Sequence, residues 1–167
     1  SCNICILEKS KFLKKTQKIK LKNKKIKWLR NLEQLYDLPS IFIANEFFDA
    51  LPIKQFIKKD NFWYEKNVNF IKNKTKLIDI LFDMKKFEKK IGFNISNKQK
   101  FIEFSPLTMD YLRIIAKKIK KKSGGILIID YGYIGRKLKN TLHSISNHKF
   151  TNVLDDFGNS DITYNIN

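Results

Sequence analysis

The stretch SIFIANEFFDALP, residues 40–52, decides how the rest of the chain is interpreted. Its apolar run from Ile41 to Ala44 predicts a buried strand, and this run breaks abruptly into Asn45 and Glu46. Pro52 prevents an unbroken helical continuation, because proline lacks the backbone N–H. We therefore predict a strand whose carboxyl end opens into a polar site with aromatic walls.

Two further apolar runs have the same form. Residues 3–7 end in Glu8, and residues 126–129 end in Asp130. Runs that are apolar throughout, with helical segments between them, predict an α/β fold whose mostly parallel sheet is covered on both faces. Ligands of such sheets bind at the carboxyl ends of the strands, so we expect the polar groups there to form the site.

The helix boundaries are marked by local signals. Ser10 is placed to cap a helix that extends to about residue 20, and a short strand is predicted over 26–29. Ser105 and Pro106 predict a second helix start, and Gly124-Gly125 its left-handed stop. The apolar stripe expected to be buried on this second helix is Leu107, Tyr111, Leu112, Ile115 and Ile119.

Residues 53–93 have a different pattern, which predicts a β-rich insertion within one domain spanning 1–167. Short β-like segments over 53–58, 62–66 and 68–72 predict an antiparallel meander. Residues 77–93 fit either strand or helix, and 134–167 are predicted to be less regular.

The formal net charge is +18, and lysine supplies nearly all of it because only three residues are arginine. One interpretation is a nucleic-acid or anionic-surface binder, since lysines displace phosphate counterions. The other is a compositional drift that spreads lysine over every solvated face. We favour the second, because sequence-specific readers prefer arginine, and we expect no specific nucleic acid.

The sequence gives no sign of a metal centre or a membrane span. Cys2 and Cys5 fall in an apolar strand, where they are interpreted as buried, inert thiols. His143 and His148 lack a spaced carboxylate or cysteine set, so we predict no metal site. No apolar run approaches the ~18 residues that cross a membrane, and no signal peptide is visible.

Glu8 has two possible roles. In nucleotide-binding α/β folds, an acid at the end of the second strand accepts hydrogen bonds from ribose hydroxyls, about 20 residues after a glycine-rich turn. Counting back from Glu8 places that turn before Ser1, so we expect an internal piece of a longer protein that lacks the first strand and its loop. Alternatively, Glu8 is only a solvated strand end.

Asn45, Glu46 and Asp49 also allow two interpretations. They could be polar caps that bond backbone N–H groups of the following turn. They could instead form a site, since Phe47 and Phe48 beside them would exclude water and strengthen charge contacts. We favour the site.

The block NEFFDALP, residues 45–52, stands within a segment over 43–56 that resembles the MidA family of S-adenosylmethionine-dependent methyltransferases. Residues 7–10, 128–133, 141–150 and 161–163 resemble other blocks of this family in the same order. The family's glycine-rich cofactor loop and its last strands have no counterpart, and Asn147 stands where a glycine is expected.

The resemblance implies a class I, Rossmann-like methyltransferase fold, with S-adenosyl-L-methionine as cofactor. It implies a protein substrate, most plausibly an arginine of a respiratory complex I subunit, in the mitochondrial matrix of a eukaryote or the cytoplasm of a bacterium. The implied catalytic residues are Asn45, Glu46 and Asp49; the implied cofactor-binding residues are Glu8, Asn45 and Phe47; the implied substrate-binding residues are Phe48, Asp130, Tyr131 and His148. We expect the fragment alone to be inactive. The alternatives are a catalytically inactive assembly scaffold and a basic nucleic-acid-binding protein.

Overall fold

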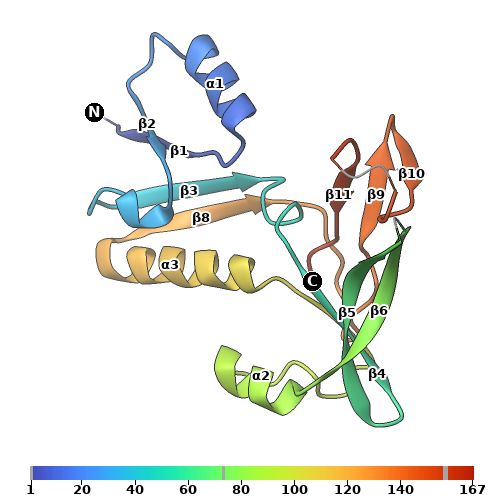
Figure 1. The fold of residues 1–167 in the computed structure, drawn as a ribbon. Helices are drawn as coiled ribbons and strands as arrows, with labels where there is room; N and C mark the ends of the chain where they lie inside the picture. Colours follow the sequence, from blue (N-terminus) through green and yellow to red (C-terminus); the bar gives the residue numbers. More distant parts are fainter. Residues whose placement is uncertain (1, 73, 156–157) are drawn as a thin grey trace. The chain divides into compact units, whose positions relative to one another are not determined.

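The computed structural model of the protein describes residues 2–72, 74–155 and 158–167. The chain divides into two compact units. The described parts of residues 1–42 and 110–127 form unit 1, and those of residues 43–109 and 128–167 form unit 2. Each unit is therefore assembled from two stretches that lie far apart in the sequence (Figure 1).

Unit 1 begins with a parallel strand–helix–strand arrangement (Figure 1). Its elements are β1 (Ile4–Leu7), α1 (Lys11–Lys20), β2 (Ile26–Leu29) and the short 3-10 helix η1 (Leu32–Gln34). β1 and β2 pair in parallel, with Ile4 opposite Ile26. Ser10 caps α1, because its Oγ accepts the backbone N–H of Leu13 at 3.2 Å. The predicted helix, its cap and both strands are confirmed to within a residue.

The strand predicted at residues 41–44 is β3 (Ser40–Asn45), and it pairs with β8 (Gly124–Ile129). At the start of the pair, the Ser40 N–H donates to the carbonyl of Ser123 at 3.2 Å. At the far end, the Glu46 N–H donates to the carbonyl of Ile129 at 2.8 Å. Since start meets start and end meets end, the two strands run in the same direction.

The second predicted helix is α3 (Pro106–Lys122). Ser105 caps it as predicted, because its Oγ accepts the Thr108 N–H at 3.1 Å. Tyr111 and Ile115 are buried as expected, whereas Leu107 is exposed and that part of the predicted stripe is wrong.

The end of α3 also differs from the prediction. Ser123, with φ +67°, is the left-handed residue that stops the helix, and Gly124 already belongs to β8. An added Cβ on Gly124 would lie 1.9 Å from the Ser40 carbonyl oxygen. Glycine is therefore needed here because it lets two strands approach closely.

The prediction that the apolar strands are buried is wrong for β3 and β8. Ile41 and Ile43 are 82% and 72% exposed, and Leu127 and Ile129 are at least half exposed. The two predicted buried thiols are also less covered than expected, with Cys2 exposed and Cys5 intermediate. An apolar run indicates that a strand's side chains can be buried from solvent, but whether they are buried depends on contacts with distant parts of a protein.

Unit 2 contains a four-stranded antiparallel sheet in the order β6-β5-β4-β7. Its elements are β4 (Lys54–Lys59), β5 (Phe62–Ile71), β6 (Lys74–Phe82), α2 (Met84–Ile91) and β7 (Phe101–Phe104). The predicted meander is present, although 62–66 and 68–72 form one continuous strand rather than two. Residues 77–93 divide between a strand and a helix. The limits of the insertion and the single-domain assignment stay predictions.

The hydrophobic core of unit 2 lies between α2 and this sheet (Figure 1). The ring of Phe56 is fully buried and lies 4.6 Å from that of Phe82 and 5.3 Å from that of Phe87, centroid to centroid. Such tilted aromatic pairs contribute beyond the area that they bury.

The last part of unit 2 is more regular than predicted. β9 (His143–Ser146) forms an antiparallel sheet with β10 (Lys149–Thr151) and β11 (Asp161–Thr163). Asn147 and His148 form the two-residue turn of a hairpin, both with positive φ. Asparagine tolerates this conformation, which is typical of hairpin turns. The pairs β1–β2 and β3–β8, which were predicted to be parallel, are parallel, and the predicted meander is antiparallel. The antiparallel sheet of β9 to β11 was not predicted, so the fold of the described residues is mixed α/β.

Candidate functional site

Asp130 fixes the turn that follows β3. Its Oδ2 accepts the backbone N–H of Phe48 at 2.9 Å and that of Asp49 at 3.3 Å. Its Oδ1 accepts the N–H of Tyr131 at 2.9 Å. A carboxylate that accepts several backbone N–H groups forms strong, charge-assisted hydrogen bonds. The side chain predicted to contact substrate therefore holds the predicted catalytic turn in place.

Asn45 and Glu46 are exposed at the carboxyl end of the β3–β8 pair. Glu46 has φ +45°, a left-handed conformation that is uncommon for glutamate and costs free energy. Its N–H bond to Ile129 and the contacts of Asp130 with the next residues hold this conformation. The structure thus presents the Glu46 carboxylate at a strained position at a strand end.

Asp49 is only 6% exposed. Its Oδ2 accepts the hydroxyl of Thr163 at 2.8 Å, and its buried Oδ1 has no hydrogen-bond partner among the described residues. Burial raises the pKa of the Asp49 carboxyl above its ordinary value; the Thr163 hydroxyl opposes this shift, and the charge of Asp130 adds to it. Asp49 is therefore a buried acid with spare acceptor capacity.

The C-terminal segment, residues 163–166, also forms hydrogen bonds with the turn that contains Phe48 and Asp49. The buried Tyr164 donates its hydroxyl to the carbonyl of Phe48 at 2.8 Å, and its N–H to the carbonyl of Asp49 at 3.3 Å. Ile166 bonds the backbone on either side of Gly132, through the Tyr131 carbonyl and the Tyr133 N–H, each at 2.9 Å. Residues more than 110 positions apart thus meet around one turn.

The remaining predicted substrate contacts lie in different surroundings. Phe48 is 1% exposed, and its ring packs edge to face on that of the half-buried Phe47. Tyr131 is 61% exposed. His148 is exposed at the hairpin tip and makes none of the hydrogen bonds that hold the turn. The roles assigned to these residues stay predictions.

Glu8 lies in unit 1 at the end of β1, and it is not a freely solvated strand end. Its Oε1 accepts the Ser10 N–H at 2.8 Å, and its Oε2 accepts the Gln17 amide at 3.0 Å. The Gln17 oxygen in turn accepts the indole N–H of Trp28 at 3.2 Å. Each carboxylate oxygen can accept a second hydrogen bond, so Glu8 is oriented yet able to accept from a ligand.

Sequence reasoning missed the cluster around Glu103 in unit 2. This carboxylate accepts from the side chains of Gln55 and Thr141, at 2.8 and 2.5 Å, and from the backbone N–H groups of Thr141 and Leu142, at 3.0 Å each. It joins the four-stranded sheet to the chain that leads into β9. Glu103 lies in a short strand that the sequence did not predict, so no local signal marked it.

The side chains that commonly bind metals are not grouped in the described residues. Within residues 2–72, 74–155 and 158–167, no group of three or more His, Cys, Asp and Glu side chains could hold a metal ion. No described helix is long and apolar enough to cross a membrane.

The structure defines a mixed α/β protein with carboxylates at the ends of its parallel strands, and comparison with known proteins identifies its family. All 167 residues match the family described as "Putative S-adenosyl-L-methionine-dependent methyltransferase". The chain belongs to this family, which is the one that the NEFFDALP block resembles.

Curated relatives of the chain are mitochondrial proteins. It is 29% identical over 148 residues to the Caenorhabditis elegans protein arginine methyltransferase NDUFAF7 homolog, and 25% identical over 141 residues to the Homo sapiens protein of that name. These alignments cover 84% of the chain but 34% and 32% of the two relatives. The chain thus spans about a third of their length.

The fold also matches solved structures. A COG1565 superfamily member and likely methyl transferase from Burkholderia thailandensis, bound to S-adenosyl-homocysteine, superposes with a TM-score of 0.75 at 17% identity. The match covers 98% of the chain and 45% of that structure. A native structure of a COG1565 superfamily protein from the same organism gives a TM-score of 0.76 over 98% of the chain and 46% of its own. These matches show that the chain shares the mixed α/β fold of those structures.

Proposed function

We propose that the protein transfers a methyl group from S-adenosylmethionine to an arginine side chain of a protein substrate. The observation that carries the proposal is the exposed Glu46 carboxylate, held in a left-handed conformation at the carboxyl end of a parallel strand pair. The family match and the names of the curated relatives support the reaction and the acceptor. A complex I subunit is the substrate class that we would test first.

Three residues are proposed to contact the cofactor. S-adenosylmethionine supplies an electrophilic methyl group on a sulfonium. Glu8 would accept ribose hydroxyls with the lone pairs that Ser10 and Gln17 leave available. Asn45 and Phe47 would contribute a polar group and an apolar surface.

We assign different roles to the two carboxylates on the acceptor side: Glu46 binds the charged guanidinium, and Asp49 positions the turn. A guanidinium arrives charged, since its pKa lies above ~12. Glu46 would orient it, because its carboxylate is exposed and its backbone is fixed. Asp49 is almost covered and bonded to Thr163, so we assign it the positioning of the turn, and its predicted catalytic contact stays a prediction. Positioning can supply most of the rate in a transfer that needs in-line approach.

Calorimetric titration of the full-length protein with S-adenosylmethionine tests the cofactor half of this proposal. Glu8→Ala should weaken binding by about tenfold or more, because hydrogen bonds to a charged acceptor contribute roughly 1.5–3 kcal/mol each. Glu33→Ala removes an exposed carboxylate from η1 and should leave binding unchanged. Circular dichroism of Glu8→Ala checks that α1 still forms.

The absence of binding, or equal affinities for wild type and Glu8→Ala, would contradict the cofactor assignment. Labelled cofactor then separates an enzyme from an inactive scaffold. A scaffold would bind the cofactor or a partner without transferring label, whereas the proposed enzyme transfers label to arginine.

A further inference from the structure

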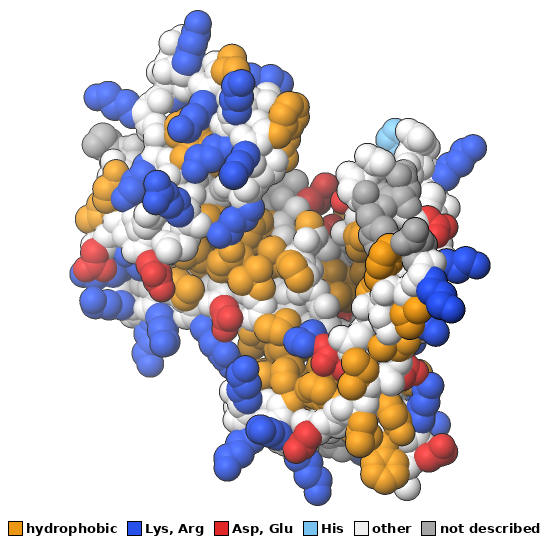
Figure 2. All heavy atoms as spheres, in the orientation of Figure 1, with side chains coloured by type: hydrophobic (Ala, Val, Ile, Leu, Met, Phe, Trp, Pro, Cys, Tyr) orange, Lys and Arg blue, Asp and Glu red, His pale blue; other side chains and the backbone are white. Residues whose placement is uncertain are grey.

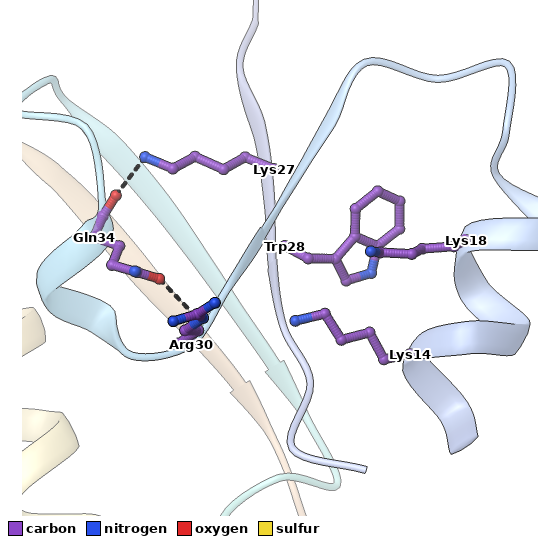
Figure 3. A pocket seen from close by; sticks show the side chains of 6 residues that line it. All are labelled: Lys14, Lys18, Lys27, Trp28, Arg30 and Gln34. Atoms are coloured by element: carbon purple, nitrogen blue, oxygen red, sulfur yellow. Dashed lines mark hydrogen bonds between the residues drawn. The ribbon is translucent and has the colours of Figure 1, made fainter. Parts of the chain in front are cut away.

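Unit 1 contains a pocket that the proposed methyl transfer does not use. Its volume is about 660 Å³, and its lining comes from α1, β2 and the chain around η1. The lining residues are Lys14, Lys18, Lys27, Trp28, Arg30 and Gln34. We refer to it as the basic pocket (Figure 3).

Four of the six lining side chains are cationic and none is anionic. Among the described residues, none of these four cations forms a salt bridge, whereas Lys118 and Lys122 in the same unit both pair with Asp37. Lysine and arginine side chains also gather on the surface over this part of unit 1 (Figure 2). Like charges that line one pocket without counterions repel one another, and a bound anion would relieve that repulsion.

One of the four cations is held by a hydrogen bond, and a second lies against an aromatic ring. Lys27 donates its Nζ to the Gln34 carbonyl at 2.7 Å, and the backbone N–H of Arg30, rather than its guanidinium, donates to the Gln34 side-chain oxygen at 2.7 Å. Figure 3 shows Lys14 and Lys18 extending from α1 toward the strand that carries Trp28. Lys18 Nζ lies 5.7 Å from the centre of the Trp28 ring, in a cation–π contact. Two of the four cations, Lys18 and Lys27, are thus positioned before any ligand binds, which lowers the entropy cost of binding.

The shape and the aromatic contacts define the class of anion. Proteins that bind single-stranded nucleic acid pair a long basic groove with aromatic rings on which bases stack. Here the indole of Trp28 already faces Lys18, and the ring of Tyr36 faces Lys27 at 4.3 Å. The four cations also come from one short stretch of the chain, residues 14 to 30. This geometry favours several linked phosphates on a small molecule over an extended strand.

We propose that the basic pocket binds a chain of linked phosphates, supplied either by a nucleoside triphosphate or by inorganic tripolyphosphate. The inference rests on the pocket alone and does not depend on the proposed methyl transfer.

Calorimetric titration of the full-length protein with sodium tripolyphosphate at about 0.1 M salt tests the proposal, since surface charges are largely screened there beyond ~10 Å. The double variant Lys14→Gln and Lys18→Gln should weaken binding by about tenfold, because each exposed charge contact contributes up to ~1 kcal/mol. Lys11→Gln with Lys15→Gln is the matched control. It removes the same charge from exposed positions of α1 outside the pocket and should change affinity less than about twofold.

Fluorescence locates the ligand. In a Trp63→Phe background, Trp28 is the only tryptophan within residues 1–167, and tripolyphosphate should change an emission signal that Trp28→Phe removes, with the midpoint found by calorimetry. ATP added in place of tripolyphosphate distinguishes the two sources: tighter binding of ATP indicates a nucleotide, and equal binding indicates recognition of the phosphates alone. AMP should bind at least about tenfold more weakly than either, since it offers one phosphate.

Three results would overturn the proposal. Equal weakening by the two double variants would show that tripolyphosphate follows the overall charge of +18 rather than the pocket. Equal binding of AMP and ATP would show that linked phosphates are not recognised. A single-stranded oligonucleotide that binds more tightly than tripolyphosphate and is weakened by the pocket variant would assign the pocket to nucleic acid.

Discussion

The Asp130→Asn substitution tests whether one carboxylate fixes the turn after β3. In the native protein, Oδ2 accepts two N–H groups, from Phe48 and Asp49, and Oδ1 accepts a third from Tyr131. Asparagine offers one acceptor oxygen and an NH₂ group. At least one of these N–H groups must therefore face another donor, whichever way the amide is turned.

The magnitude follows from these contacts. A hydrogen bond to a charged group contributes about 1.5–3 kcal/mol, and leaving a donor unpaired costs free energy as well. Asp130 is half-buried, and the bond from Asp49 is long at 3.3 Å, so we expect a loss near the low end, about 2 kcal/mol. Weaker repulsion of Asp49 offsets part of this loss, because the charge of Asp130 contributes to the raised pKa of Asp49.

Urea denaturation at pH 7 measures the change in the free energy of unfolding. The control is Asp110→Asn, which removes the same charge from an exposed position on α3 that is paired only weakly with Arg113, at 3.7 Å. If the two variants agree within about 0.5 kcal/mol, the normal range for surface changes, Asp130 does not fix the turn.

Three further predictions follow from single positions. Asp49→Asn should stabilise the protein relative to wild type at neutral pH and lose this advantage at acid pH. Because the pKa of the Asp49 carboxyl is raised in the folded state, wild type loses stability as the pH rises from the unfolded-state pKa through the folded-state pKa. Urea melts at several pH values measure this, and an advantage that does not vary with pH would contradict it. Glu46→Gly should raise the free energy of unfolding by about 1 kcal/mol, because glycine adopts the left-handed conformation without strain. The same variant should abolish methyl transfer, and unchanged transfer would exclude Glu46 from the acceptor site. Gly124→Ala should lower the free energy of unfolding by about 3 kcal/mol or more, because its Cβ would collide with the Ser40 carbonyl. Gly125→Ala is the control: its Cβ has open space, so the loss should be less than about 1 kcal/mol. Similar melting temperatures for the two variants would refute the close approach of the strands.

The features that the sequence predicted correctly depend on near neighbours. Ser10 and Ser105 each cap a backbone N–H three residues ahead, so the signal and its partner are read from the same few positions. The strand that ends at Asn45 was placed by an abrupt change from apolar to polar residues.

The features that the sequence did not predict depend on distant contacts. Asp130 was placed at a strand end, but its role in holding Phe48 and Asp49 joins positions 81 and 82 residues apart. The contacts of Thr163 and Tyr164 with the same turn span 114 and 116 residues. The strands β9 to β11 are only three or four residues long, too short for an alternating pattern to stand out.

The burial of β3 and β8 failed for a related reason. Apolar side chains such as Ile41 show that a surface can be buried, but whether it is covered depends on packing partners that a local pattern does not reveal. The positions of the strands along the chain were therefore predicted better than the solvent exposure of their side chains.

Transfer of a labelled methyl group from S-adenosylmethionine by the full-length protein would show most directly whether it methylates arginine. With arginine-containing protein substrates, including complex I subunits, we expect label on arginine, loss of that label in Glu46→Gln, and retention of label in the Glu33→Ala control. Binding of the cofactor without any transfer, or label that is unaffected by Glu46→Gln, would contradict it.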